Sequence, residues 1–125
     1  MANKSHILKF RAVNQDTFEA IRDGKKKVET RAFTVKYRNI KAGDELTFSC
    51  GKDKFSRKIR TVKVFKSITA LLKKYKPRQI HPKMKTAEEL TALYHSFPGY
   101  EQKIKKFGLL AMELSSGGGS ATGGN

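Results

Sequence analysis

The residues best suited to do chemistry lie in one short segment, Gly24 to Arg31, which reads GKKKVETR. It holds a single carboxylate, Glu29, among four cations. The whole chain of 125 residues carries 27 Lys and Arg against 11 Asp and Glu, a formal net charge of +16. A carboxylate kept among cations is typical of a site that holds a polar ligand, and the surrounding charge indicates a piece of nucleic acid.

Each ionic side chain of this segment has a chemical role open to it. Lys26 can contact a phosphate, or act as a general base if burial and neighbouring cations lower its pKa. Glu29 can accept a hydrogen bond from the exocyclic amine of a base, or form an internal ion pair with Arg31 or Lys27. Arg31 can anchor Glu29 or bind a phosphate bidentately. A solvated lysine and a purely structural ion pair stay open as alternatives.

The composition narrows the class of protein and of ligand. The cations are spread through the chain and do not form a detachable tail, which predicts nucleic acid as the partner. The lone Cys50 excludes an internal disulfide and a cysteine metal cage. His6, His81 and His95 lack the spacing of metal ligands, so we expect no metal and no cofactor.

The chain shows no sign of export or of a membrane span. It has no apolar run of 18 residues, and its first residues, MANKS, lack the apolar core of a secretory signal. We therefore expect a cytoplasmic protein without a membrane partner.

The GKKKVETR segment must be positioned by the elements that flank it. A capping-box pattern at Asp16 to Glu19 predicts the start of a short helix with Phe18 and Ile21 facing inward. Gly24 is placed to end that helix, and residues 27–31 return as a strand. The chemistry-bearing side chains are thus expected at the start of a strand.

Alternating apolar residues predict further strands over 6–12, 45–50, 55–65 and 107–114. In the strand 55–65 the apolar face changes near Thr61-Val62, which predicts a bulge of the kind that a small barrel needs. Ser67 and Thr86 are expected to cap two more helices, and 33–41 and 78–85 to be loops. The expected core residues are Leu8, Phe10, Leu46, Phe48, Val62, Val64 and Leu110.

These elements predict an α+β fold, a small and mostly antiparallel β-barrel with about three short helices. Residues 1–114 are expected to form one domain. Residues 115–125 are Gly/Ser-rich and are expected to be a flexible tail or an added linker. In the loop 33–41, Tyr37 and Phe33 can stack on a base or fill the core, and Arg38 adds a cation beside them.

Four motifs together resemble the ASCH domain, the activating-signal-cointegrator homology family. They are the pattern Gly24-x-Lys26-x-x-Glu29-x-Arg31, the segment IKAGD at 40–44, the helix 88–97 and the strand FGLLAMEL at 107–114. The resemblance runs from about residue 6 to residue 114. It implies a PUA-like β-barrel with a cleft beside the first motif, and a role related to RNA.

Some members of the ASCH family hydrolyse the acetyl group of N4-acetylcytidine, and this chain resembles them at Lys26. Those members have a Thr where this chain has Glu29. They have a further Glu in the helical insertion, which here reads KKYKPR at 73–78, without a carboxylate. A few other members are described as ribonucleases.

The sequence thus favours an RNA-binding module whose basic cleft takes a nucleotide or a single-stranded segment. The expected nucleic-acid contacts are Lys26, Lys27, Glu29, Arg31, Tyr37 and Arg38. The alternative is an enzyme, a small hydrolase acting on a modified nucleoside or a ribonuclease, with Lys26 as the base and Glu29 as its partner. A module that binds acidic proteins is a third reading, because a basic surface also suits such partners.

Overall fold

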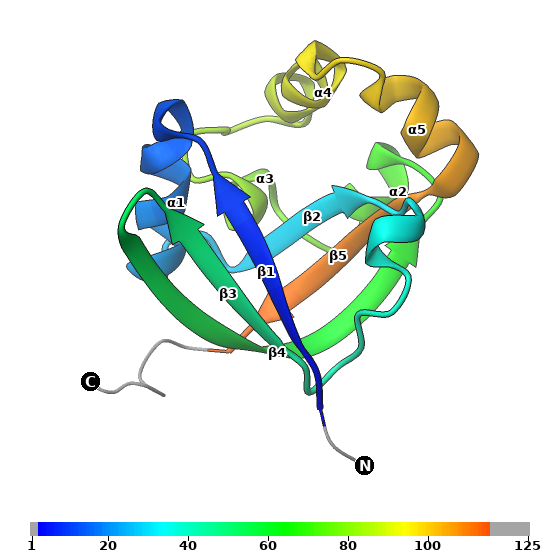
Figure 1. Cartoon of the computed structure of the whole chain (residues 1–125). Coiled ribbons are helices and arrows are strands. Elements are labelled where there is room, and N and C mark those ends of the chain that lie inside the picture. The colour runs from blue at the N-terminus through cyan, green and yellow to red at the C-terminus, as the bar shows by residue number, and fades with distance from the viewer. Residues whose placement is uncertain (1–2, 116–125) are drawn as a thin grey trace.

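The computed structural model describes residues 3–115, so the predicted tail lies outside the described residues from 116 onward. The fold is built on five strands, β1 (Ser5–Phe10), β2 (Val28–Ala32), β3 (Glu45–Cys50), β4 (Asp53–Phe65) and β5 (Leu109–Leu114). They form one sheet in the order β1-β3-β4-β5-β2. All neighbouring strands are antiparallel except the parallel pair β1 and β3. The sheet curls into a half-barrel, which confirms the predicted α+β class and the mostly antiparallel sheet (Figure 1).

Strand β4 allows the sheet to curl, because its two halves pair with different neighbours. Residues 53–58 pair with β3, and residues 59–65 pair with β5. Between the halves the register shifts at Ile59 and Thr61, so the predicted bulge is confirmed. An inserted residue bends a strand and increases its twist, which turns the two halves of the sheet toward each other.

Residues 3–115 form five α-helices around the sheet, whereas the sequence predicted about three. They are α1 (Gln15–Arg22), α2 (Ile68–Leu72), α3 (Pro77–Ile80), α4 (Ala87–Ser96) and α5 (Tyr100–Phe107), with single 3-10 turns at Ala12–Asn14 and Val35–Tyr37. The two unpredicted helices are α3, which overlaps the start of the expected loop 78–85, and α5. Helix α5 carries a short apolar stripe at helical spacing, Tyr100, Ile104 and Phe107, which the sequence reasoning did not use.

The helix starts follow local hydrogen bonding. Ser67 and Thr86 cap α2 and α4 as predicted, because each side chain accepts a hydrogen bond from the main chain of the first turn. The capping box predicted at Asp16 is wrong. Helix α1 begins at Gln15, two residues before the start that a cap at Asp16 would give, and no side chain caps it.

The core has two parts, and β5 belongs to both. Leu110 and Met112 face the inside of the half-barrel with α1, whereas Leu109 and Ala111 face α2 to α5. A strand buried on both faces reads as a continuous apolar run, which is the pattern of LLAM at 109–112. Of the predicted core, Leu8, Leu46, Phe48 and Leu110 are buried, and Phe10 and Val62 pack against them. The prediction for Val64 is wrong: its side chain is 41% exposed, because at this end of β4 Phe65 enters the core instead.

Candidate functional site

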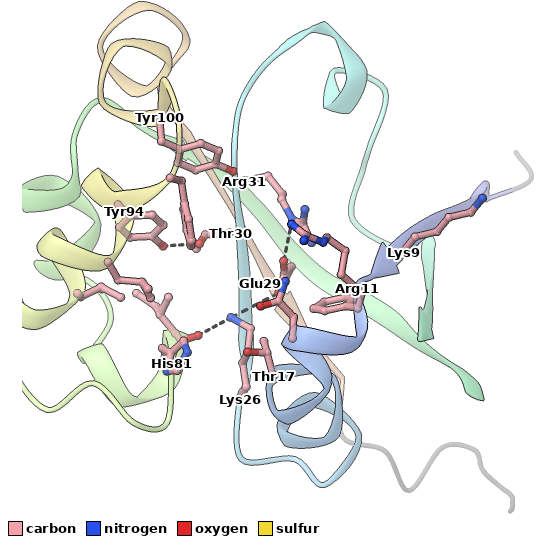
Figure 2. A pocket seen from close by; sticks show the side chains of 16 residues that line it. Lys9, Arg11, Thr17, Lys26, Glu29, Thr30, Arg31, His81, Tyr94 and Tyr100 are labelled. Atoms are coloured by element: carbon pink, nitrogen blue, oxygen red, sulfur yellow. Dashed lines mark hydrogen bonds and ion pairs between the residues drawn. The ribbon is translucent and has the colours of Figure 1, made fainter. Parts of the chain in front are cut away.

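A cavity of about 360 Å³ lies between the two ends of the curled sheet. One wall comes from the end of β1 and the turn after it, with Lys9, Phe10 and Arg11. Strand β2 contributes residues 29–31, and the segments from α3 to α5 close the other side (Figure 2). This volume falls at the lower end of the roughly 300–1,000 Å³ typical of small-molecule sites.

The short strand β2 places its side chains by simple alternation. Glu29 and Arg31 are two residues apart and share one face, while Thr30 points to the other. Arg31 Nε donates a hydrogen bond to Glu29 Oε2 at 2.8 Å. The internal ion pair that the sequence allowed is therefore present.

Lys26 enters the same wall from the turn before β2. The positive φ of +81° at Gly24 ends α1 and reverses the chain. Lys26 is only 6% exposed, and its Nζ donates to the main-chain oxygens of Val28, at 2.9 Å, and of Ile80. It also lies 3.4 Å from Glu29 Oε1. The alternative of a solvated lysine is therefore wrong.

One oxygen of this buried ion cluster is left without a hydrogen bond. Glu29 is 4% exposed, and its Oε2 is taken by Arg31. The contact of Oε1 with Lys26 is an ion pair that lacks hydrogen-bond geometry, and no other described residue reaches Oε1. Buried polar atoms are seldom left in this state. Oε1 has almost no accessible surface, so it is an unused acceptor that a guest in the cavity reaches when the Glu29 side chain turns toward it.

Burial opposes the charged form of each group in the cluster, and the neighbouring opposite charges offset this effect. Burial lowers the pKa of Lys26, and the Glu29 carboxylate offsets only part of that effect. Burial raises the pKa of Glu29, but Lys26 and Arg31 together outweigh it and hold the pKa below its usual value. Burial likewise opposes the charge of Arg31, yet Glu29 raises the pKa of the guanidinium. Two cations around one anion leave a net positive charge in the wall, which favours an anionic ligand.

An aromatic wall faces the ion cluster across the cavity. The rings of Tyr94 and Tyr100 are parallel within 4°, with centroids 6.2 Å apart, and Phe97 meets both edge-on. The Tyr94 hydroxyl is hydrogen-bonded to Thr30 Oγ1, and the Tyr100 hydroxyl accepts from the Ala32 N–H at 3.2 Å. Burial raises the pKa of Tyr94, so its hydroxyl stays protonated. Flat apolar surfaces of this kind suit a planar ring.

Sequence reasoning missed this wall and the basic edge of the cavity. The spacing of Tyr94, Phe97 and Tyr100, three residues apart each time, was the signal that could have found it, but the helix α5 that carries Tyr100 was not predicted. Lys9, Arg11 and His81 also line the cavity. Burial, with Lys26 and Lys83 nearby, lowers the pKa of His81 and favours its neutral ring.

Three other predicted contacts lie away from the cavity lining. Lys27 is exposed, and its main-chain N–H donates to Gln79 O. Tyr37 is half-buried and packs against the core inside the half-barrel. Arg38 is exposed and holds its guanidinium 5.3 Å from the centre of the Phe33 ring. The structure thus brings together Lys26, Glu29 and Arg31 and leaves the other three outside.

Residues 3–115 contain no group of three or more His, Cys, Asp or Glu side chains that could hold a metal ion. Within the same residues, no helix is long and apolar enough to cross a membrane.

Comparisons with known proteins give structural relatives. No protein-family model and no curated protein matches the chain. The crystal structure of the hypothetical protein PH0355 is similar, with a TM-score of 0.75 and 31% identity over 90% of this chain and 97% of that one. The solution structure of protein PF0455 from Pyrococcus furiosus has a TM-score of 0.70 and 29% identity over 90% and 96%. At this identity and coverage, the chain belongs to the same family as the hypothetical protein PH0355.

Proposed function

We propose that this protein is an RNA-binding module of the ASCH, PUA-like class, working in the cytoplasm, that takes an unpaired nucleotide of single-stranded RNA into the cavity beside β2. The base would lie against the aromatic wall and the phosphates would lie at the basic edge. The four motifs of the sequence and the curled antiparallel sheet support this class.

The observation that carries the proposal is the free lone pair of the buried Glu29 Oε1. A carboxylate held ionised in a cavity, with no hydrogen bond on one oxygen, suits a ligand that brings an N–H group. Nucleobases with an exocyclic amine bring such a group, as cytosine does to a carboxylate. Tyr94 is itself buried, so the half-buried ring of Tyr100, which lies parallel to it, and the exposed ring of Phe97 supply the surface on which a single-stranded base can stack.

The charges around the mouth suit the phosphates. Lys9 and Arg11 are exposed at the edge of the cavity, and the whole chain carries a net charge of +16. Arg31 lies partly beneath them, with its guanidinium 5.8 Å from the centre of the Phe10 ring. Exposed cations supply affinity that does not depend on the base, whereas contacts to base edges supply selectivity.

Binding of fluorescein-labelled RNA pentamers of A, C, G and U and DNA pentamers of A, C, G and T, followed by anisotropy, tests the proposal. We expect binding that weakens with salt, with log K falling by about 0.7 for each phosphate neutralised and each tenfold rise in salt. Glu29→Gln should reduce the preference among bases, and the double variant Lys9→Ala/Arg11→Ala should weaken all pentamers alike. Glu45→Gln, at an exposed position of β3, is the matched control.

Two results contradict the proposal. Binding of no pentamer at low salt excludes nucleic acid as the partner. Equal loss for every pentamer in Glu29→Gln, with the fold intact by circular dichroism, assigns Glu29 a purely structural role.

A hydrolase is the second candidate, because the ion pair of Lys26 and Glu29 lies in the cavity wall and burial lowers the pKa of Lys26. Water would add to the acetyl carbonyl of N4-acetylcytidine, and cleavage of the C–N bond would give acetate and cytidine. Chromatography of N4-acetylcytidine after incubation, beside gel analysis of labelled RNA for ribonuclease activity, tests this. Turnover that Lys26→Ala abolishes would favour the enzyme over the module.

A further inference from the structure

The free edge of β2 runs along the cavity, and its main chain carries one N–H and one C=O without a hydrogen-bond partner among residues 3–115. Strand β2 is the last strand of the sheet, and within residues 3–115 its only strand partner is β5. In an antiparallel pair, alternate residues exchange hydrogen bonds with the partner, and those between them point to the opposite edge. Leu114 N donates to Lys27 O and Phe33 N donates to Gly108 O, so the bonded positions of β2 are the odd ones.

The even positions of β2 therefore face the free edge, and most of their main-chain groups are already taken. Val28 O accepts from Lys26 Nζ. The N–H of Ala32 donates to the Tyr100 hydroxyl, and its C=O accepts from Thr34 N. Thr30 lies between them, is 9% exposed and lines the cavity. By the register of β2 and β5 its main-chain N–H and C=O face away from β5, and no turn, loop or side chain of residues 3–115 bonds them, although buried main-chain groups are nearly always paired.

We infer that Thr30 reads the edge of the bound base through its own main chain, its N–H donating to a ring or carbonyl acceptor and its C=O accepting from a neighbouring N–H. This inference rests on the proposed function and assigns the residue that holds the base in plane. Every common base presents an acceptor beside a donor on its Watson–Crick edge. The N–H and C=O of one strand residue point the same way, which is the complement of such an edge.

The same edge does not suit an added peptide strand. Strand addition uses the main chain of several alternate residues in a row. Here the groups on either side of Thr30 are occupied by Lys26 and Tyr100. The wall of α4 and α5 also closes the cavity beside Thr30, because the Tyr94 hydroxyl is hydrogen-bonded to its side chain. A single free donor and acceptor in a closed space fits a flat heterocycle.

The test combines modified RNA with observation of the Thr30 amide. The RNA pentamer that binds most tightly is remade with a methyl group on the Watson–Crick ring nitrogen, N1 in purines or N3 in pyrimidines. We expect the methylated pentamer to bind about tenfold more weakly or worse, because two hydrogen bonds are lost. In ¹⁵N–¹H spectra, the Thr30 amide should shift downfield with the unmodified pentamer and stay unchanged with the methylated one.

Two variants separate the main chain of Thr30 from its side chain. Thr30→Pro removes the N–H at an edge position, where proline is tolerated, and should weaken binding about tenfold. Thr30→Val keeps the N–H and loses only the hydroxyl that bonds Tyr94, and should stay within about threefold. If Thr30→Pro does not fold, the amide shift of the parent protein decides.

The outcomes distinguish this inference from the function on which it rests. Salt-dependent binding with an unmoved Thr30 amide and no effect of methylation overturns the inference and leaves the RNA-binding function standing. Absence of binding by every pentamer overturns both.

Discussion

The buried pair of Lys26 and Glu29 should show strong thermodynamic coupling, measurable by a double-mutant cycle. Glu29→Gln keeps the shape of the side chain and removes the negative charge between Lys26 and Arg31. Lys26 then stays buried at 6% exposure with only two main-chain oxygens as partners. Lys26→Met removes the positive charge instead and leaves Glu29 with Arg31 alone.

The expected magnitude follows from burial. Removing one partner of a buried ion pair costs about 3–5 kcal/mol, because the remaining charge is left uncompensated. In the double variant Lys26→Met/Glu29→Gln, neither charge remains, and Arg31 is 24% exposed and can reach water. We therefore expect the double variant to lose about 2 kcal/mol less than the two single variants added together.

The assay is urea unfolding at pH 7, followed by circular dichroism, with unfolding free energies extrapolated to water. The control is the same cycle at Asp16 and Lys83, whose carboxylate and ammonium lie 3.0 Å apart but are 78% and 68% exposed. An exposed pair contributes about 0–1 kcal/mol, so its coupling should be small. A coupling energy at Lys26 and Glu29 no larger than that of the exposed pair would refute the reasoning.

The pH dependence of this coupling has a definite sign. The pKa of Glu29 is lowered in the folded protein, so its contribution to stability is complete well above its ordinary value of 4.5. The contribution should decline as the pH falls below that value, and it is lost once the pH passes the folded pKa. The same cycle measured at a series of acidic pH values checks this.

Three further predictions concern other parts of the fold. Gly108→Ala should lower the unfolding free energy by about 2 kcal/mol or more, because φ is +87° and an added Cβ would lie 2.8 Å from Val64 Cγ1. Gly24→Ala is the control: its φ is also positive, +81°, but the space around it is open, so it should lose only about 1 kcal/mol in the same urea titration. The Asp44 carboxylate accepts hydrogen bonds from Lys4 N and Lys41 N and pairs with His6. These contacts, the one with His6 most of all, lower the pKa of Asp44 from 3.8 to about 2. Asp44→Asn should therefore be less stable than the parent by about 2 kcal/mol at pH 7, and thermal melts should show the difference vanishing as the pH falls from about 4 to 2. Tyr94→Phe should cost about 1 kcal/mol, because the buried Thr30 hydroxyl loses its partner, and a melting curve that matches the parent would contradict that bond.

The sequence predicts best where a pattern is local and strongly periodic. The strand 45–50, the bulge in β4 and the caps at Ser67 and Thr86 each depend on a few neighbouring residues, and each is confirmed. Helix α5 was missed although Tyr100, Ile104 and Phe107 recur at helical spacing, because this stripe is short and only Ile104 of it is buried. Its place in the fold comes from packing against β2 and α4.

The candidate site was predictable in part for a similar reason. Glu29 and Arg31 meet because alternation on a strand places residues two apart on one face, which the sequence alone can show. The burial of Lys26 depends on Ile80 O, which lies 54 positions away, and the cavity wall depends on Tyr94. No sequence pattern joins such distant residues, so the sequence left open whether the Lys26 ammonium is solvated, and the fold encloses it.

The order of strands in the sheet has a consequence for how the protein is made. Among residues 3–115, strand β2 pairs only with β5, so Val28 meets Glu113, which is 85 positions later in the chain. On the ribosome, the GKKKVETR segment therefore emerges long before its strand partner β5 (Figure 1). The hairpin of β3 and β4, whose ends Cys50 and Asp53 are close in sequence, can form long before. A nascent chain therefore carries the cations of the candidate site without its cavity until translation has delivered β5.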